Sequence, residues 1–223
     1  SVDEGQSERV PDVCVEIEAR DRIAGDREVA GGRADRHVLP GFALRQGHVR
    51  VERAGRLGDH EALDIYSSTM TYRALGEQVA KAAQALNGLG VTAGDRVALV
   101  LPNCPQHVVA FYAVLRLGAV VIEHNPLYTA EELQVQLADH GAKVAIVWDK
   151  AASAVQQVAG QTQVETVVAV DLTTALPRLK RFLLRLPVAS ARSTRAAMTA
   201  PASGTLSWER LVAGAAPLDP SRP

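Results

Sequence analysis

Between residues 62 and 171 the apolar residues follow two kinds of pattern in turn. Stretches with an apolar residue every three or four positions indicate helices that bury one face. Short uninterrupted apolar runs bounded by Gly, Asp or Asn indicate strands that are buried on both faces. The pattern predicts helices over 71–90, 105–117, 130–141 and 151–160, and strands over 95–103, 118–124, 142–148 and 164–170.

Residues at the helix ends support these boundaries. Pro105 is suited to a first helical turn, because its missing N–H would be unpaired there anyway. Thr129 and Glu132 have the spacing of a capping box. Gly88 and Gly90 indicate a helix end. We expect the inward-facing apolar residues to form one core, made of Leu75, Val79, Val97, Leu99, Val109, Leu115, Val121, Ile122, Val144, Ile146 and Val168.

The even spacing of the expected strands predicts the fold class. The strands begin near Arg96, Ala119, Lys143 and Glu165, at steps of 23, 24 and 22 residues. Apolar strands that alternate with helices at such steps indicate an α/β fold, with a parallel sheet covered by helices on both faces. The carboxyl ends of the strands then share the edge at which ligands bind in such sheets. Those ends are Pro102-Asn103-Cys104, His124-Asn125-Pro126 and Trp148-Asp149-Lys150.

Individual residues at this edge have plain structural interpretations. His124 and Asn125 are placed where a ligand binds, but we expect Asn125 to shape the turn and His124 to satisfy backbone groups. Cys104 precedes a helix, which can lower a thiol pKa, yet a small buried side chain is the simpler interpretation. Asp149 and Lys150 are most simply a charged pair on the surface at a helix start. The sequence therefore offers no catalytic, cofactor-binding or metal-ligating residue. No G-x-G-x-x-G follows the first strand, which argues against a dinucleotide site.

The two flanking regions are patterned differently. Residues 1–58 have no useful apolar stripe and contain neither Lys nor Asn. We interpret them as a poorly patterned N-terminal arm, which is either a natural variable segment or an artefact of the reading frame. Residues 59–171 form the expected α/β subdomain. Residues 172–223 carry a basic insertion helix, a short helix capped by Ser207 and a Pro-rich tail.

The basic helix is expected to run from Arg178 to Leu186, between Pro177 and Pro187. Its apolar residues are spaced i, i+3, i+4 and i+7, which makes one face apolar. Two interpretations remain open: the face packs against the protein's own core, or it contacts an anionic membrane surface. The residues of the second interpretation are Arg178, Leu179, Arg181, Phe182, Leu183, Arg185 and Leu186.

Composition narrows the possible partners and compartment. The net charge of -1, from 24 basic and 25 acidic residues, gives no general attraction to nucleic acid. Two cysteines make neither a disulfide framework nor a zinc pattern and suit a reducing cytosol. The N-terminus lacks the basic and apolar regions of a secretory signal. We therefore expect a cytoplasmic protein, peripheral at the inner membrane face if the basic helix contacts lipid; the sequence does not indicate an oligomeric state.

Four segments together resemble the N-terminal subdomain of the acyl-adenylate-forming enzymes, the AMP-dependent synthetases and ligases. In order they are MTYRAL (70–75), GVTAGDRVALVLPN (90–103), AVLRLGAVVIEHNPLYTAEEL (113–133) and HGAKVAIVWD (140–149). The resemblance is close over 59–171 and loose over 172–223. NPLYTAEEL and the basic insertion resemble the bacterial long-chain fatty-acid CoA ligases in particular.

The resemblance implies an acid–thiol ligase that turns a fatty acid, ATP and coenzyme A into acyl-CoA, AMP and pyrophosphate, with Mg²⁺. No run like Ser/Thr-Gly-Thr-Thr-Gly-x-Pro-Lys, the family's adenylation loop, occurs in the sequence; ASGTLSW (202–208) is the nearest and lacks Pro-Lys. We therefore expect this fragment alone to be inactive and to bind none of these cofactors well. The alternative is a non-catalytic α/β binding or scaffolding domain.

Overall fold

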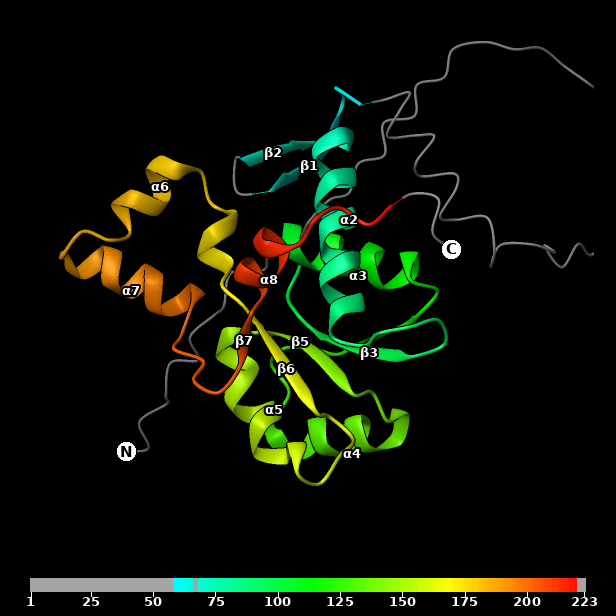
Figure 1. The fold of residues 1–223 in the computed structure, drawn as a ribbon. Coiled ribbons are helices and arrows are strands. Elements are labelled where there is room, and N and C mark those ends of the chain that lie inside the picture. Colours follow the sequence, from blue (N-terminus) through cyan, green and yellow to red (C-terminus); the bar gives the residue numbers. More distant parts are fainter. Residues whose placement is uncertain (1–57, 66–67, 220–223) are drawn as a thin grey trace, which may run out of the picture. The chain divides into compact units, whose positions relative to one another are not determined.

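A parallel sheet of five strands, in the order β4-β3-β5-β6-β7, is the centre of the computed structural model (Figure 1). The structure describes residues 58–65 and 68–219, so the expectations for residues 1–57 lie outside the described part. The strands are β3 (Arg96–Val100), β4 (Val120–Glu123), β5 (Val144–Trp148), β6 (Thr166–Val170) and β7 (Leu206–Ser207). All four pairings between neighbouring strands of this sheet are parallel, which the strand spacing predicted for β3 to β6.

Helices cover both faces of this sheet, which confirms the predicted fold class. Buried residues of α2 (Tyr72–Gly88), α3 (Pro105–Arg116) and α8 (Trp208–Gly214) share one apolar cluster with one face of the sheet. Buried residues of α4 (Ala130–His140) and α5 (Ala152–Ala159) share a second cluster with the other face. Successive side chains of a strand point to opposite faces, so β3 and β5 contribute alternate residues to both clusters.

The predicted single core is therefore two clusters, one on each side of the sheet. Eight of the eleven residues expected to form one core do lie together in the first cluster, and Val121 packs against it partly buried. Leu115 and Ile122 belong to neither cluster and are only half-buried, so the prediction is wrong for them. Ile122 lies on β4, which is an edge strand, and an edge strand has a neighbour on one side only.

Two pairings were not expected from the sequence. β1 (Glu61–Ile65) and β2 (Ser68–Thr71) form a separate antiparallel hairpin just before α2. The two-residue strand β7 pairs with β6, with Leu206 beside Val168. A strand of two residues carries no periodicity, so the hydrophobic pattern had no means of revealing β7.

The helix ends follow the predicted chemistry. The Thr129 hydroxyl accepts from the Glu132 N–H and the Glu132 carboxylate accepts from the Thr129 N–H, which completes the capping box of α4. Gly141 ends α4 in the left-handed conformation at φ 63°, which a residue without Cβ adopts freely. Ser207 caps α8 by accepting from the Arg210 N–H.

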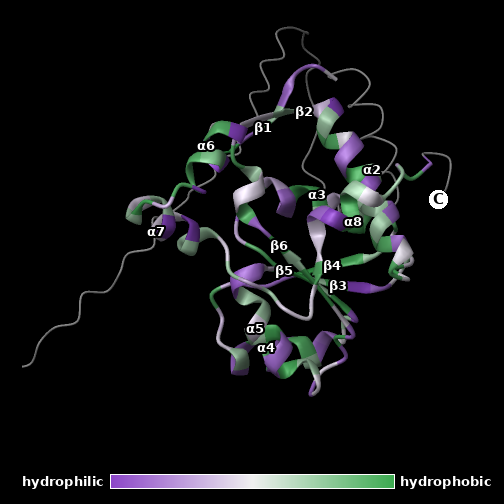
Figure 2. Cartoon of the chain, turned by 60° about the vertical axis from the view of Figure 1, so that its left-hand side comes forward, coloured by the Kyte–Doolittle hydropathy of each residue, from purple (hydrophilic) through white to green (hydrophobic). Residues whose placement is uncertain are grey.

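The segment after β6 carries a 3-10 turn and helices that differ from the expectation. That turn is η2 (Leu172–Ala175); another 3-10 turn, η1 (Asp149–Ala151), lies earlier, between β5 and α5. Helix α6 (Arg178–Leu183) ends three residues before the predicted Leu186, and none of its residues is buried. Helix α7 (Ala189–Met198), which was not expected, follows it and buries only Ala191. Both helices lie to one side of the sheet and its covering helices in the two ribbon views (Figures 1 and 2).

Candidate functional site

The parallel register brings the carboxyl ends of β3, β4 and β5 to one edge of the sheet, as expected. The residues after β4 form a turn, in which the Asn125 side chain accepts from the Leu127 N–H at 3.0 Å and its backbone carbonyl accepts from the Tyr128 N–H. This confirms that Asn125 shapes the turn.

His124 contacts side chains rather than the backbone groups that we expected. Its Nδ1 lies 2.7 Å from Gln136 Oε1, and its Nε2 lies 2.9 Å from Nε2 of His140. His140 Nδ1 accepts from the Ala142 N–H at 3.1 Å. Each nitrogen in this chain of contacts has a partner only if both rings are neutral, with His140 donating to His124 and His124 donating to Gln136.

Burial is the main cause of a lowered pKa at His140, and the neighbouring His124 lowers that pKa further. A second proton on either ring would place two N–H groups head to head or break the bond from Ala142. The pair thus holds the turn after β4 against α4 in the neutral state. It is a structural link, and no substrate-facing role follows from its geometry.

Cys104 is the buried side chain that the simpler interpretation predicted. Its sulfur caps α3 by accepting from the His107 N–H at 3.3 Å, and it is 1% exposed. Burial raises the pKa of this thiol to about 11, so the helix start does not activate it.

Asp149 is buried, which corrects the prediction of a charged pair on the surface. Its carboxyl is 6% exposed; Oδ2 accepts from the Thr199 hydroxyl, and Oδ1 has no partner. Burial raises its pKa to about 6. Lys150 makes no ion pair with it: the ammonium donates to the Ala197 carbonyl at 3.3 Å and lies 5.2 Å from the centre of the Trp148 ring.

A polar cluster that sequence reasoning missed lies at the ends of β6 and β7. The Glu209 carboxylate accepts from the Asp171 N–H at 3.1 Å and from the Ser207 hydroxyl at 3.0 Å. Gln106 Nε2 donates to the Thr174 hydroxyl at 2.9 Å, and its Oε1 is buried without a partner. Burial raises the pKa of Glu209. These residues come from α3, α8 and the turn after β6, and no shared motif in the sequence signals that they meet.

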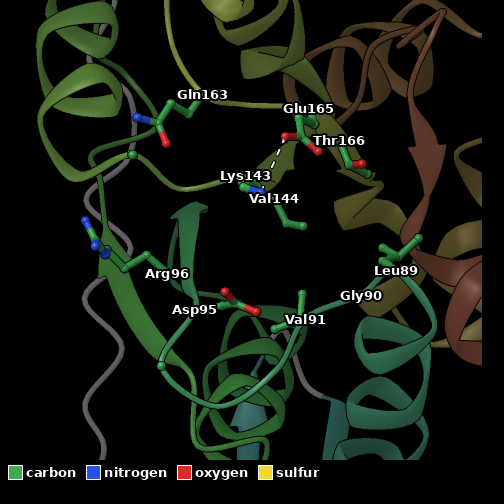
Figure 3. Close-up of a pocket in the computed structure, with 12 residues that line it drawn as sticks. Leu89, Gly90, Val91, Asp95, Arg96, Lys143, Val144, Gln163, Glu165 and Thr166 are labelled. Atoms are coloured by element: carbon green, nitrogen blue, oxygen red, sulfur yellow. Dashed lines mark ion pairs between the residues drawn. The ribbon is translucent and has the colours of Figure 1, made fainter.

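A hollow lies at the opposite edge of the sheet, where the strands begin (Figure 3). It has a volume of about 440 Å³ and is lined by Asp95, Arg96, Lys143 and Glu165 among others. Lys143 pairs with Glu165 at 3.7 Å, and Asp95 accepts from Thr92, so these charges have partners within the protein. Asp95 and Arg96 form an exposed rim of this hollow, and we assign it no ligand.

The described residues contain no group of three or more His, Cys, Asp or Glu side chains that could hold a metal ion. No helix among them is both long and apolar enough to cross a bilayer.

The seven residues of the predicted membrane contact lie on α6 and the turn that follows it. All are exposed except Arg181, which is half-buried, and Arg185 and Leu186 lie beyond the helix end. The structure therefore does not pack the apolar stripe against the clusters of the sheet, which was the first of the two interpretations.

Comparison with known proteins identifies relatives over somewhat more than half of this chain. A Yersinia pestis long-chain-fatty-acid–CoA ligase is 38% identical over 134 residues, which are 60% of this chain and 24% of that protein. An acetyl-coenzyme A synthetase of Mycobacterium bovis is 39% identical over 131 residues, 57% of this chain and 18% of that protein. The chain thus spans about a quarter or less of the length of these relatives.

A solved structure, the fatty acyl CoA synthetase of Mycobacterium tuberculosis, matches with a TM-score of 0.53 and 28% identity over 57% of this chain and 27% of that one. The profile of the family described as AMP-binding enzyme matches residues 51–221. Because that match covers well over half of the chain, this protein belongs to the family of AMP-binding enzymes.

Proposed function

We propose that this chain is the N-terminal part of an ATP-dependent long-chain fatty-acid CoA ligase. The whole enzyme would join a fatty acid to coenzyme A and release AMP and pyrophosphate. The observation that carries the proposal is the 38% identity to a long-chain-fatty-acid–CoA ligase over 134 residues. The four segments that carry the resemblance form the start of α2, the strands β3, β4 and β5, and parts of α3 and α4, so they lie within the described fold.

The described residues supply a scaffold rather than the cofactor site. At the carboxyl edge the unpartnered polar atoms are Oδ1 of Asp149 and Oε1 of Gln106, and both are acceptors. Phosphate oxygens of ATP are acceptors as well, and the carboxylates of Asp149, Asp171 and Glu209 lie near these atoms, while the Lys150 ammonium donates to the Ala197 carbonyl. These acceptors therefore do not fit a triphosphate. Carboxylates can ligate Mg²⁺, but the described residues contain no group of three or more His, Cys, Asp or Glu side chains that could hold a metal ion, and we assign them no step of the reaction. Their proposed role is to hold the sheet edge in shape.

A fusion enzyme tests the proposal. The chain would be joined to the remaining part of the Yersinia pestis ligase at two alternative junctions, after Asp171 and after Asp219. We expect pyrophosphate release that depends on both ATP and a long-chain fatty acid from at least one fusion. The 223-residue chain alone and the relative's remaining part alone serve as controls, and we expect neither to release pyrophosphate.

An assay with acetate in place of the fatty acid distinguishes the activity of a long-chain fatty-acid CoA ligase from that of an acetyl-coenzyme A synthetase. Preference for the long-chain acid supports the proposal. Two soluble fusions that unfold cooperatively yet turn over no fatty acid would overturn it, and would favour a non-catalytic binding or scaffolding domain.

A further inference from the structure

We propose that residues 178–188, named here the α6 face, bind reversibly to the surface of an anionic membrane. This inference rests on the surface itself and does not depend on the proposed ligase activity. The occupant we commit to is a lipid bilayer with negatively charged headgroups.

The α6 face contains more than half of the large apolar side chains that are exposed in the described residues. Five of the nine large apolar side chains that are exposed there fall between 179 and 188. Leu179 is 70% exposed and Phe182 is 62% exposed. Figure 2 shows apolar and hydrophilic residues next to each other along α6. Soluble proteins seldom gather exposed apolar residues in one place unless something covers them.

The positive charge of the α6 face and its neighbours favours an anionic surface as the binding partner. From residue 172 to residue 208 the chain has six basic residues and no acidic one, although the whole protein is nearly neutral. Arg178 and Arg185 are exposed beside the apolar side chains, and Arg192 and Arg195 are exposed on α7. An apolar stripe flanked by cations complements a bilayer whose headgroups are anionic.

Helix α7, which follows the α6 face, is attached at its end to the carboxyl end of β5 by three consecutive residues. Trp148 Nε1 donates to the Met198 carbonyl at 2.8 Å, and Lys150 donates to the Ala197 carbonyl at 3.3 Å. Between them, Asp149 accepts from the Thr199 hydroxyl. The α6 face is therefore followed by a helix whose end is fixed to the predicted ligand edge.

The contact is expected to be weak. The helix has six residues, and four apolar side chains of the stripe can enter the headgroup region. A short amphipathic segment with a few basic residues gives reversible binding that salt weakens.

Vesicle co-sedimentation of the full 223-residue chain tests the proposal. We expect binding to vesicles of equal parts phosphatidylglycerol and phosphatidylcholine, no binding to phosphatidylcholine alone, and loss of binding at high salt. Each basic residue near an anionic surface contributes enough that reversing two of them, Arg181→Glu with Arg185→Glu, should lower the partition coefficient roughly tenfold or more. Phe182→Ser should lower it as well, because it removes the largest apolar side chain of the face.

Two controls match these variants in chemistry but lie elsewhere. Lys81→Glu with Arg210→Glu makes the same change of net charge on α2 and α8, and Val135→Ser removes an apolar side chain that is 71% exposed on α4. We expect both control variants to bind vesicles as the unchanged chain does.

Three results would overturn the proposal. The first is equal sedimentation with anionic and neutral vesicles. The second is an equal loss of binding in the control and α6 variants, which would indicate a general charge effect. The third is no vesicle binding together with a dimer that Phe182→Ser dissociates, which would assign the α6 face to a second copy of the chain.

Discussion

Helices α2 and α6 both carry apolar residues at helical spacing, yet one buries its stripe and the other does not. Leu75, Val79 and Leu86 of α2 are buried in the first cluster of the sheet. Leu179, Phe182 and Leu183 of α6 are exposed. The difference lies in the partner: α2 packs against α3 and α8, whereas α6 has six residues and buries none. Periodicity thus identifies an apolar face, but length and neighbours determine what covers it.

Truncation of one residue in each stripe should give the largest contrast. Leu86 is 1% exposed, and Leu86→Ala should cost about 2–5 kcal/mol of unfolding free energy, because it leaves a cavity under α2. Leu179→Ala should cost less than about 0.5 kcal/mol, as surface changes do. Urea unfolding of the two variants measures both values. A cost of several kcal/mol for Leu179→Ala would show that α6 is packed after all.

The attachment of the end of α7 to the end of β5 should depend on pH through the Asp149 carboxyl, which accepts from the Thr199 hydroxyl. Burial raises the pKa of its carboxyl from 3.8 to about 6, so the folded state binds the proton more tightly than the unfolded state. The ionisation of Asp149 therefore costs no stability below pH 3.8; the cost grows between pH 3.8 and about 6 and is constant above that. Asp149→Asn should remove this cost and stabilise the protein by about 1–3 kcal/mol above pH 6.

Unfolding curves of Asp149→Asn and of the unchanged chain at several pH values measure this effect. Burial raises the pKa of Glu209 as well, but Glu209 is present in both proteins. The difference between their free energies of unfolding therefore reports on Asp149 alone. A constant difference at every pH would mean that the carboxyl does not titrate between these values.

Helix caps should give the smallest of these effects. Thr129 closes the capping box of α4, whereas Pro177 at the start of α6 provides no side-chain cap. Thr129→Ala should cost about 1 kcal/mol, and Thr129→Ser, which keeps the hydroxyl, should cost little. Thermal unfolding of both variants compares them. Equal losses would mean that the hydroxyl bond contributes nothing to α4.

The sequence predicted those parts of the fold that long apolar patterns and local chemistry define. The four strands β3 to β6, the capping box at Thr129 and the cap at Ser207 all follow from neighbours in the chain. The edge position of β4, which leaves Ile122 half-buried, depends on the order of strands in space and is not contained in any local pattern.

The candidate site was less predictable for the same reason. Asp149 follows a strand and precedes a helix turn, a position that usually faces solvent. It is buried because Thr199, fifty residues later, returns to the same point. Glu209, Gln106 and Asp171 meet across comparable distances in the chain. Contacts of this kind arise from the tertiary fold and leave no spacing to recognise.

Hydrogen exchange along the full chain, with and without anionic vesicles, tests the contrast between α2 and α6 most directly. Amides of α2 and β5 should exchange only by global unfolding, and those of α6 should exchange far faster by local opening. Anionic vesicles should slow exchange in α6 and leave α2 unchanged. Exchange in α6 that is as slow as in α2 without vesicles would contradict the account.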